Sequence, residues 1–210
     1  AWQRWQPQPS RHALVDFDLP NPAGVLEDFL HRRGEQYHLK MSSPLSAPEA
    51  CSRLSVQLAS GRLSMRTVVQ STWRAQQEAK TWPVEQRRTW PKALAAFQSR
   101  LHWHCHFMQK FESEPELEHR NMARSCDGLR EDDFDEAKFE AWCTGNTGYP
   151  FIDACMRFLH ATGWINFRMR AMLVSCAAYD LWLHWQRPAH HLAQLFIDFE
   201  PGIPYPQVQM

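Results

Sequence analysis

The sequence predicts an all-α protein, and two observations support this class. Apolar side chains recur at helical spacing, as in residues 22–33, where Val25, Leu26, Phe29 and Leu30 share one stripe. Proline and glycine stand where helices begin and end, and no segment alternates apolar and polar residues as a half-buried strand would. Apolar residues make up 44% of the 210 positions, which is enough for a hydrophobic core.

The chain divides into a leader and a helical domain. Residues 1–21 are rich in Gln and Pro, so we expect an extended leader there and a helical domain over residues 22–210. The pattern Ser46–Glu49 is typical of a capping box and predicts a helix that continues to Gly61. Residues 167–185 are apolar nearly all round, which predicts the central helix. Further helices are expected to begin at Ser64, Pro91, Pro150 and Pro188, and the third of these to end at Gly163.

Composition restricts the classes of function. The 23 Lys and Arg residues balance the 23 Asp and Glu residues, so bulk charge gives no argument for nucleic-acid binding. The six cysteines lie far apart and form no C-x-x-C pair, which is typical of reduced, mostly buried thiols in a cytoplasmic protein. No apolar run reaches the ~18 residues that a membrane-spanning helix needs, so we expect no membrane association.

Two patterns resemble metal sites, and neither is sufficient. His102 and His106 share a helix face at i, i+4 spacing, as metal ligands on a helix do, but a third ligand is missing. The acidic segment 112–136 is typical of a solvated loop. We therefore expect no metal.

Two other features carry more chemical information. The sequence CSRLS, residues 51–55, lies early in an expected helix, where hydroxyl side chains and free backbone N–H groups suit a phosphate. Arg168 and Arg170 lie in an otherwise apolar stretch, and a buried guanidinium requires a carboxylate or phosphate partner. Asp198 and Glu200 are the candidate partners. A structural ion pair and a ligand-positioning pair both remain open.

The segment TGYPFIDACMRFLHATGW, residues 147–164, resembles a stretch of the photolyase/cryptochrome flavoproteins, T-G-Y-P-x-[IV]-D-A-x-M-R-x-L-x-x-T-G-W. As in that family, it is followed by an R-x-R pair, a D-L-x-x-x-W segment ending at Trp185, and an L-x-x-D-x-[DE] segment. CSRLS resembles the family's [TS]-S-x-L-S phosphate-binding motif, with Tyr37 upstream at the expected place. SRLHWHCHF, residues 99–107, takes the place of the helix that faces the lesion pocket. The resemblance covers about residues 25–210.

The resemblance implies an all-helical FAD-binding domain like the catalytic domain of photolyases and cryptochromes. On the diphosphate side, the cofactor-binding residues that it implies are Tyr37, Cys51, Ser52, Leu54 and Ser55. Around the isoalloxazine they are Trp164, Arg168, Arg170, Asp198 and Glu200, and His104 is a further cofactor-binding residue. The lesion-facing residues that it implies are Arg100, Trp103 and Phe167.

The resemblance also implies two catalytic tryptophans. Trp103 would lie at the cavity mouth, where its flat ring can stack on a flipped pyrimidine. Trp185 matches the middle member of the family's tryptophan electron-transfer chain. FAD is the cofactor that the resemblance implies, and damaged DNA is the partner.

The sequence departs from the family pattern at several of these positions. Arg100 stands where the family has a glutamate that contacts the dimer, and His104 stands where it has an arginine. Phe167 replaces an asparagine, although Asn166 lies one place earlier. By direct spacing, Pro204 replaces the asparagine that faces flavin N5. In the same way, Val208 replaces the flavin-proximal tryptophan.

The length of the chain also differs from the family pattern. We expect the chain to lack the family's N-terminal α/β antenna domain and to be truncated at the C-terminal end of the helical domain. Three functions remain open: a photolyase-like enzyme that uses light-driven electron transfer from reduced flavin to repair pyrimidine dimers, a cryptochrome-like blue-light sensor or FAD-binding module without repair activity, and a helical fragment with an incomplete flavin site. The sequence sets neither the lesion nor the oligomeric state.

Overall fold

A computed structural model describes residues 20–210, and nearly all of the expected leader lies outside the described residues. In residues 20–210 the secondary structure is helical and contains no strand, which confirms the predicted all-α class. The α-helices are α1 (Pro22–Asp28), α2 (Tyr37–Lys40), α3 (Ala47–Ala50), α4 (Ser55–Ala59), α5 (Met65–Thr81), α6 (Val84–Arg87), α7 (Trp90–Ser113), α8 (Glu136–Thr144), α9 (Pro150–Thr162), α10 (Phe167–Ser175), α11 (Gln186–Leu195) and α12 (Pro204–Val208).

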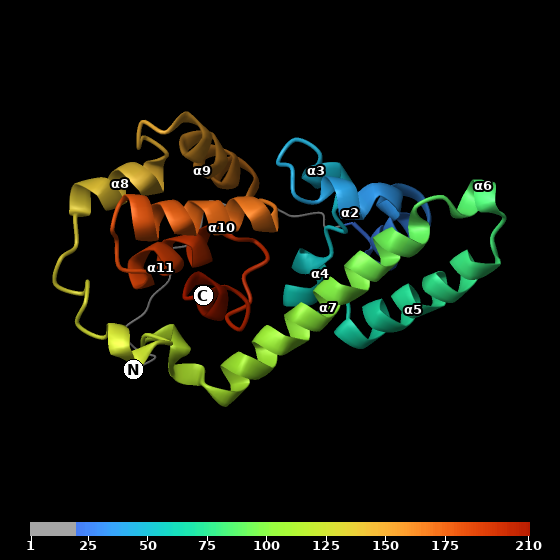
Figure 1. Cartoon of the computed structure of the whole chain (residues 1–210), viewed down its shortest axis with the longest axis horizontal. Coiled ribbons are helices and arrows are strands. Elements are labelled where there is room, and N and C mark those ends of the chain that lie inside the picture. Colours follow the sequence, from blue (N-terminus) through green and yellow to red (C-terminus); the bar gives the residue numbers. More distant parts are fainter. Residues whose placement is uncertain (1–19) are drawn as a thin grey trace.

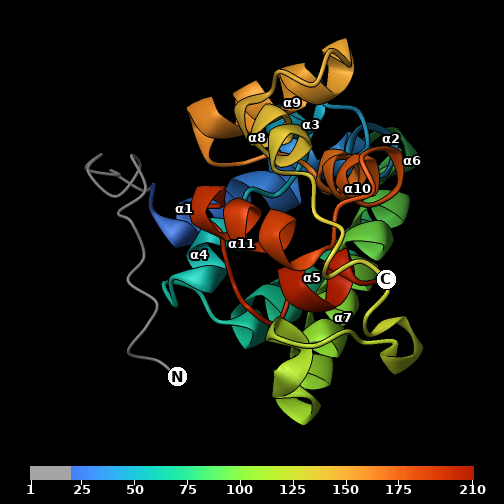
Figure 2. The same ribbon diagram turned by 90° about the vertical axis from the view of Figure 1, so that its left-hand side faces the viewer.

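The helices form two halves that α7 joins (Figure 1). Helices α1–α6 make up one half and α8–α12 the other, and the long α7 runs along both. The N-terminal part of α7 packs against α5, and its C-terminal part passes α12. Seen from the side, α8 and α9 lie at one edge of the molecule and α7 at the opposite edge (Figure 2).

Each half has its own hydrophobic core. In the first, the rings of Phe29, Tyr37 and Phe97 meet edge to face, with centroids 4.7 to 5.7 Å apart. In the second, Trp142 is fully buried, and its indole N–H donates to the carbonyl of Leu173 at 3.1 Å. Between the two cores, residues of the first half contact residues of the second half, as Asn166 does with Met41 and Ser42.

Several predicted helix ends are confirmed. The Ser64 hydroxyl caps α5 by accepting the N–H of Thr67 at 3.1 Å. Pro150 opens α9, and Gly163 ends it in a left-handed conformation with φ of 66°. Local sequence sets these ends, because the residues involved are close in the chain.

The expectation of one helix over residues 46–61 is wrong. Ser46 makes no side-chain cap bond, and its hydroxyl donates to a backbone carbonyl further upstream. Helix α3 ends at Ala50, and α4 begins only at Ser55. Arg53 between them has φ of 58°, which no helix accommodates. CSRLS is therefore a turn between two short helices rather than the first turn of one.

The expectation of one central helix over residues 167–185 is also wrong. Helix α10 ends at Ser175, a π-helical turn follows over Cys176–Asp180, and Trp182 has φ of 61°. A left-handed residue ends a helix because its backbone cannot continue the hydrogen-bond pattern. The side chains of Phe167 and Tyr179 are exposed, so this segment is buried on one side only.

All six cysteines are free, in line with the reduced thiols expected from the sequence, but they are less buried than expected. Cys155 and Cys176 are buried, whereas Cys126 is exposed. The segment 112–136 exposes most of its side chains, as expected for a solvated loop. Among residues 20–210, no helix has the length and apolar character needed to span a membrane.

Candidate functional site

The candidate site is built around the turn of residues 51–54, between α3 and α4. Arg53 is left-handed and Leu54 right-handed, with φ of −87° and ψ of −10°. Successive backbone N–H groups in such a left- and right-handed pair form a concave site that suits an anion. The N–H groups of Ser52, Arg53 and Ser55 make no hydrogen bond with other described residues. Within residues 20–210, the turn therefore presents three N–H donors that no other group uses.

Arg53 links this turn to the segment between α9 and α10. Its guanidinium carbon lies 4.0 Å from the centre of the Trp164 ring, in a cation–π contact. Burial lowers the pKa of the Arg53 guanidinium, and the nearby Asp198 carboxylate acts in the opposite direction. A left-handed arginine costs about 1–3 kcal/mol, and such strain is typical of functional sites.

Arg170 pairs with Asp198 in the other half of the molecule. Its Nη2 donates to both carboxylate oxygens, at 2.8 and 3.0 Å, and its Nε donates to the carbonyl of Ile165 at 2.8 Å. The guanidinium carbon also lies 4.1 Å from the centre of the Phe196 ring. Arg170 and Asp198 therefore form an ion pair, as expected. Whether this pair also positions a ligand is taken up below as a proposal.

Tyr37 and Cys51 bring two neutral groups to the site. Burial raises the pKa of the Tyr37 hydroxyl well above its usual range, the neighbouring Cys51 raises it further, and Arg100 lowers it in part. Burial also raises the pKa of the Cys51 thiol to about 11. Both groups are therefore uncharged near neutral pH. Arg100 is exposed on α7, and its positive charge lies close enough to the Tyr37 hydroxyl to lower the pKa of that group in part.

Glu200 connects the segment after α11 to α7. Its Oε2 lies 2.9 Å from Nε2 of His104, which is one helical turn after Arg100. These residues come from both halves of the molecule and from α7, and we call the set of them the site perimeter. Its members are Tyr37, Cys51, Arg53, Asp198, Glu200, His104 and Arg100, with Arg170 behind Asp198.

The other residues expected on the diphosphate side lie in the turn or directly after it. Leu54 is buried in the first core, and Ser55 is the first residue of α4. The Ser52 hydroxyl accepts the N–H of Leu54 at 3.4 Å, a weak contact that shapes the turn.

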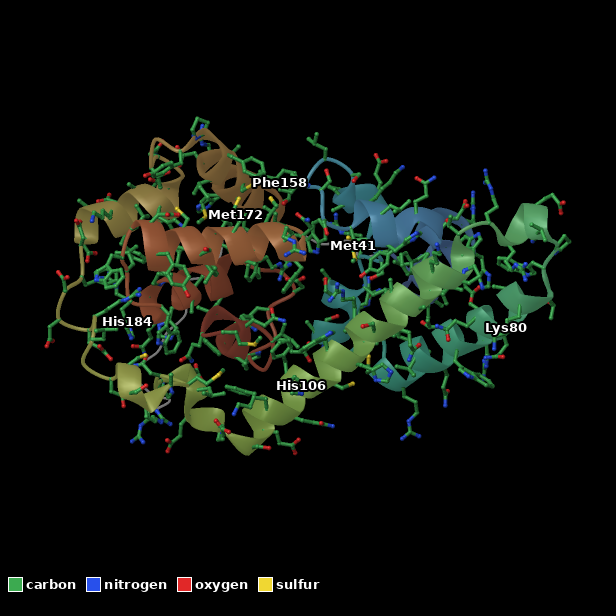
Figure 3. All side chains as sticks on the ribbon, in the orientation of Figure 1. Met41, Lys80, His106, Phe158, Met172 and His184 are labelled. Atoms are coloured by element: carbon green, nitrogen blue, oxygen red, sulfur yellow. The ribbon has the colours of Figure 1, made fainter. Side chains whose placement is uncertain are left out.

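Three residues expected near the flavin or the lesion lie on the surface. Trp103 is 46% exposed and Phe167 is 56% exposed. The side chain of Arg168 is exposed and makes no hydrogen bond or ion pair with other described residues. His106, labelled on α7 in Figure 3, contacts the Trp103 ring edge-on at 5.6 Å. These side chains are available to a partner rather than to the core.

Asn166 is buried and its side chain makes hydrogen bonds, whereas its neighbour Phe167 is exposed. Its Nδ2 donates to the carbonyls of Met41 and Ser42, both at 3.1 Å. Figure 3 shows Met41 at the junction of the two halves. Asn166 therefore joins the halves beside the site perimeter.

Trp185 lies outside the site perimeter, in a separate polar cluster. Its indole N–H donates to Oδ1 of Asn121 at 2.6 Å, and Nε2 of His184 lies 3.2 Å from the same oxygen. Asn121 Nδ2 donates to Asp127 and Glu131, both at 2.9 Å. The pKa of Glu131 is lowered to about 2 by backbone hydrogen bonds to its carboxylate, of which the one from the N–H of Arg130 has the largest effect. Asn121, Glu131 and His184 of this cluster line a cavity of about 230 Å³.

A larger cavity, of about 630 Å³, adjoins the site perimeter. It lies between α1, α3, α4 and the end of α9, and its lining includes Arg33, Arg53, Gln57 and Ile197. Arg53 is the member that it shares with the perimeter. In the described part of the chain, no group of three or more His, Cys, Asp or Glu side chains is arranged to hold a metal.

Sequence reasoning missed two of the residues that shape these sites. Arg33 contacts the turn from 16 to 19 residues away, and Asn121 meets Trp185 from 64 residues away. No local motif marks either residue. The polar segment around Asn121 gave no signal beyond its acidic composition.

Comparison with known proteins agrees with this architecture. Residues 97–210 match the family model for the FAD binding domain of DNA photolyase. Over 186 residues the chain is 32% identical to the deoxyribodipyrimidine photo-lyase of Vibrio cholerae. This alignment covers 86% of this chain and 36% of that protein. Over 67 residues it is 40% identical to cryptochrome DASH of Idiomarina loihiensis. This alignment covers 32% of this chain and 15% of that protein.

Solved structures have the same fold. A class III photolyase from Agrobacterium tumefaciens superposes with a TM-score of 0.77 at 24% identity, over 90% of this chain and 36% of that one. A cryptochrome from Synechocystis sp. PCC6803 gives a TM-score of 0.74 at 25% identity, over 89% of this chain and 37% of that one. The chain therefore spans little more than a third of the proteins that it matches over most of its length.

The family match covers more than half of the chain, and the helical fold agrees with it. The chain belongs to the family of FAD-binding domains of DNA photolyases.

Proposed function

We propose that the chain binds FAD inside the site perimeter and serves light-driven repair of pyrimidine dimers in DNA. One observation carries the proposal. Arg53 belongs to the turn 51–54, whose N–H donors have no partner among the described residues, and its guanidinium lies close enough to Asp198, the partner of Arg170, for the two charges to interact. FAD has an anionic diphosphate and a polar flavin edge, and these two elements suit its two parts. When bound, FAD supplies the light-driven electron transfer.

The residues of the diphosphate side have the chemistry that two phosphates require. Ser52 and Ser55 contribute backbone N–H groups that are free of other partners among the described residues. Tyr37 and Cys51 are neutral, because burial raises the pKa of each. They therefore add no negative charge that would repel a diphosphate. Buried Leu54 fixes the turn to the first core.

The residues of the flavin side hold charge in a fixed place. Arg170 anchors the buried Asp198 carboxylate, so a carboxylate–guanidinium pair of defined orientation can set the protonation of the flavin edge. His104 and Glu200 are bonded to one another across the perimeter. We assign Trp164 to the wall of the site, because it is buried beneath Arg53.

The exposed residues suit damaged DNA. Trp103 offers a flat ring next to the perimeter residue His104, and a base flipped out of the helix can stack on such a ring. Phe167 offers a second exposed ring. Arg168 has no carboxylate partner among the described residues, so we assign it to a DNA phosphate rather than to the flavin.

Dimer loss under blue light tests this function. The purified chain, loaded with FAD and kept under a reducing agent, is irradiated with single-stranded DNA that contains pyrimidine dimers. We expect dimer loss with the wild-type chain and a loss slower by about 5- to 150-fold with Trp103→Ala, because stacking on an aromatic ring contributes about 1–3 kcal/mol per base. Trp73→Ala, which changes an exposed tryptophan on α5, is the control.

A cryptochrome-like function without repair is the second candidate, and Arg100 favours it. A positive charge replaces the acceptor that the family places against the dimer, and this charge lies close to the Tyr37 hydroxyl, whose pKa it lowers in part. Bound FAD without dimer loss in the experiment above supports this candidate. If Arg100 instead attracts DNA phosphate, Arg100→Glu should weaken DNA binding and flatten its dependence on salt.

A further inference from the structure

Arg33 holds the turn 51–54 by its backbone carbonyls. Its Nη1 donates to the carbonyls of Glu49, at 3.1 Å, and of Cys51, and its Nη2 donates to that of Ser52 at 2.6 Å. Its Nε donates to the Asp28 carboxylate at 2.7 Å, which fixes the guanidinium plane. One side chain thus binds three carbonyls of the segment that leads into the turn.

These contacts decide where the N–H groups of the turn point. A trans peptide is planar, and its C=O and N–H point in opposite directions. Because the carbonyls of Cys51 and Ser52 face Arg33, the N–H groups of Ser52 and Arg53 face away from it. These are two of the N–H groups that have no partner among the described residues.

Arg33 also helps to maintain a strained conformation. Arg53 has φ of 58°, which an L-residue adopts only when the surroundings impose it. Lysine cannot replace Arg33 here, because only a planar guanidinium directs several N–H groups to fixed acceptors at once. The three carbonyls and the Asp28 carboxylate use Nε, Nη1 and Nη2 of Arg33 together.

We infer that Arg33 is a positioning residue for the diphosphate of FAD: it orients the donors of the turn 51–54 without touching the cofactor itself. This inference rests on the proposed binding of FAD at that turn. It predicts an effect that is specific for the diphosphate, because the flavin side of the perimeter lies on other elements. General loosening of the fold would instead weaken the binding of every part of the cofactor.

Flavin fluorescence titration of the purified chain with FAD and with riboflavin, which lacks the diphosphate, tests this assignment. We expect Arg33→Gln to weaken FAD binding by about tenfold, or about 1.4 kcal/mol, and to leave riboflavin binding within about twofold of wild type. Arg33→Lys should lose FAD affinity to a similar extent. Arg32→Gln, at the exposed neighbouring position, should bind both ligands as the wild type does.

The possible outcomes separate the inference from the function on which it rests. Wild-type FAD affinity in Arg33→Gln, or equal losses of FAD and riboflavin affinity, overturns the positioning role. If Arg33→Gln does not fold, Arg33→Lys decides, since wild-type FAD affinity in that variant also overturns it. A wild-type chain that binds riboflavin but not FAD overturns both the inference and the proposed function.

Discussion

Arg170 and Asp198 form the best-shielded ion pair of the candidate site. Nη2 of Arg170 lies 2.8 and 3.0 Å from the two carboxylate oxygens, and the two side chains are 19% and 2% exposed. The pair connects α10 with the segment that follows α11. A carboxylate this well buried depends on its partner, because desolvation without a counter-ion is costly.

Asp198→Asn should destabilise the chain and weaken flavin binding. The variant leaves Arg170 without its counter-ion but keeps one acceptor, so we expect a loss of about 2–3 kcal/mol in the free energy of unfolding, below the 3–5 kcal/mol typical of a broken buried pair. Urea unfolding measures this loss. Glu136→Gln removes the carboxylate of the exposed Arg187–Glu136 pair and should change stability much less. Equal effects of the two variants would contradict the structural role of the buried pair.

The partly buried His191 should make stability depend on pH. Its buried Nε2 atom has no hydrogen-bond partner within residues 20–210, and its ring lies among Trp142, Phe139 and His160. Burial, and to a lesser extent the charge on His160, lowers the pKa of His191 from 6.5 to about 4. Between these values the unfolded chain binds more protons than the folded one, so stability falls as the pH decreases from 6.5 to 4.

Between pH 6.5 and pH 4, the titration of His191 should lower the free energy of unfolding by about 3 kcal/mol. His191→Phe removes the titrating group and suits the aromatic neighbours, so its unfolding free energy should vary less between pH 7 and pH 4.5. His102→Gln, at an exposed position on α7, should keep the wild-type dependence. A His191→Phe variant with the wild-type slope would show that His191 does not cause the acid sensitivity.

Gly163 should tolerate alanine less well than Gly148 does. Both glycines have positive φ, 66° and 85°, so a side chain strains either one by about 1–2 kcal/mol. A Cβ at Gly163 would also lie 2.5 Å from Cγ2 of Ile197, next to Asp198, whereas nothing lies within 4 Å at Gly148. Thermal unfolding should therefore show a clearly larger loss for Gly163→Ala. Equal losses would mean that Ile197 moves aside freely.

Trp185→Phe should slow the light-driven reduction of bound FAD. The Val208 position has no aromatic ring, so we expect Trp185 to supply an electron through another route, and phenylalanine cannot be oxidised in its place. Flavin absorption followed under blue light with an external reductant should show at least about a tenfold lower rate, or about 1.4 kcal/mol in the barrier. Trp73→Phe is the control, and an unchanged rate in Trp185→Phe would remove this residue from the route.

Features that short segments determine could be predicted from the sequence, and those that distant residues determine could not. The ends of α5 and α9 at Ser64, Pro150 and Gly163 follow from local backbone preferences. The turn at Arg53 does not, because Arg33 stabilises it from twenty residues upstream. Local patterns alone favoured a continuous helix there.

The candidate site shows the same division. The need of Arg170 for a carboxylate could be read from its apolar surroundings, and Asp198 was one of two candidates. The contact of Trp185 with Asn121 could not be read, since it depends on how the acidic segment packs against the second half. The exposure of Phe167 and Arg168 also depends on tertiary packing rather than on the motif that contains them.

The absorption spectrum of the purified chain, before and after addition of FAD, shows whether the site perimeter holds the cofactor. We expect a bound-flavin spectrum with resolved bands that survives removal of free FAD by gel filtration, and that is weakened in Asp198→Asn and Arg33→Gln. A chain that is folded by circular dichroism but retains no flavin after incubation with FAD would contradict it.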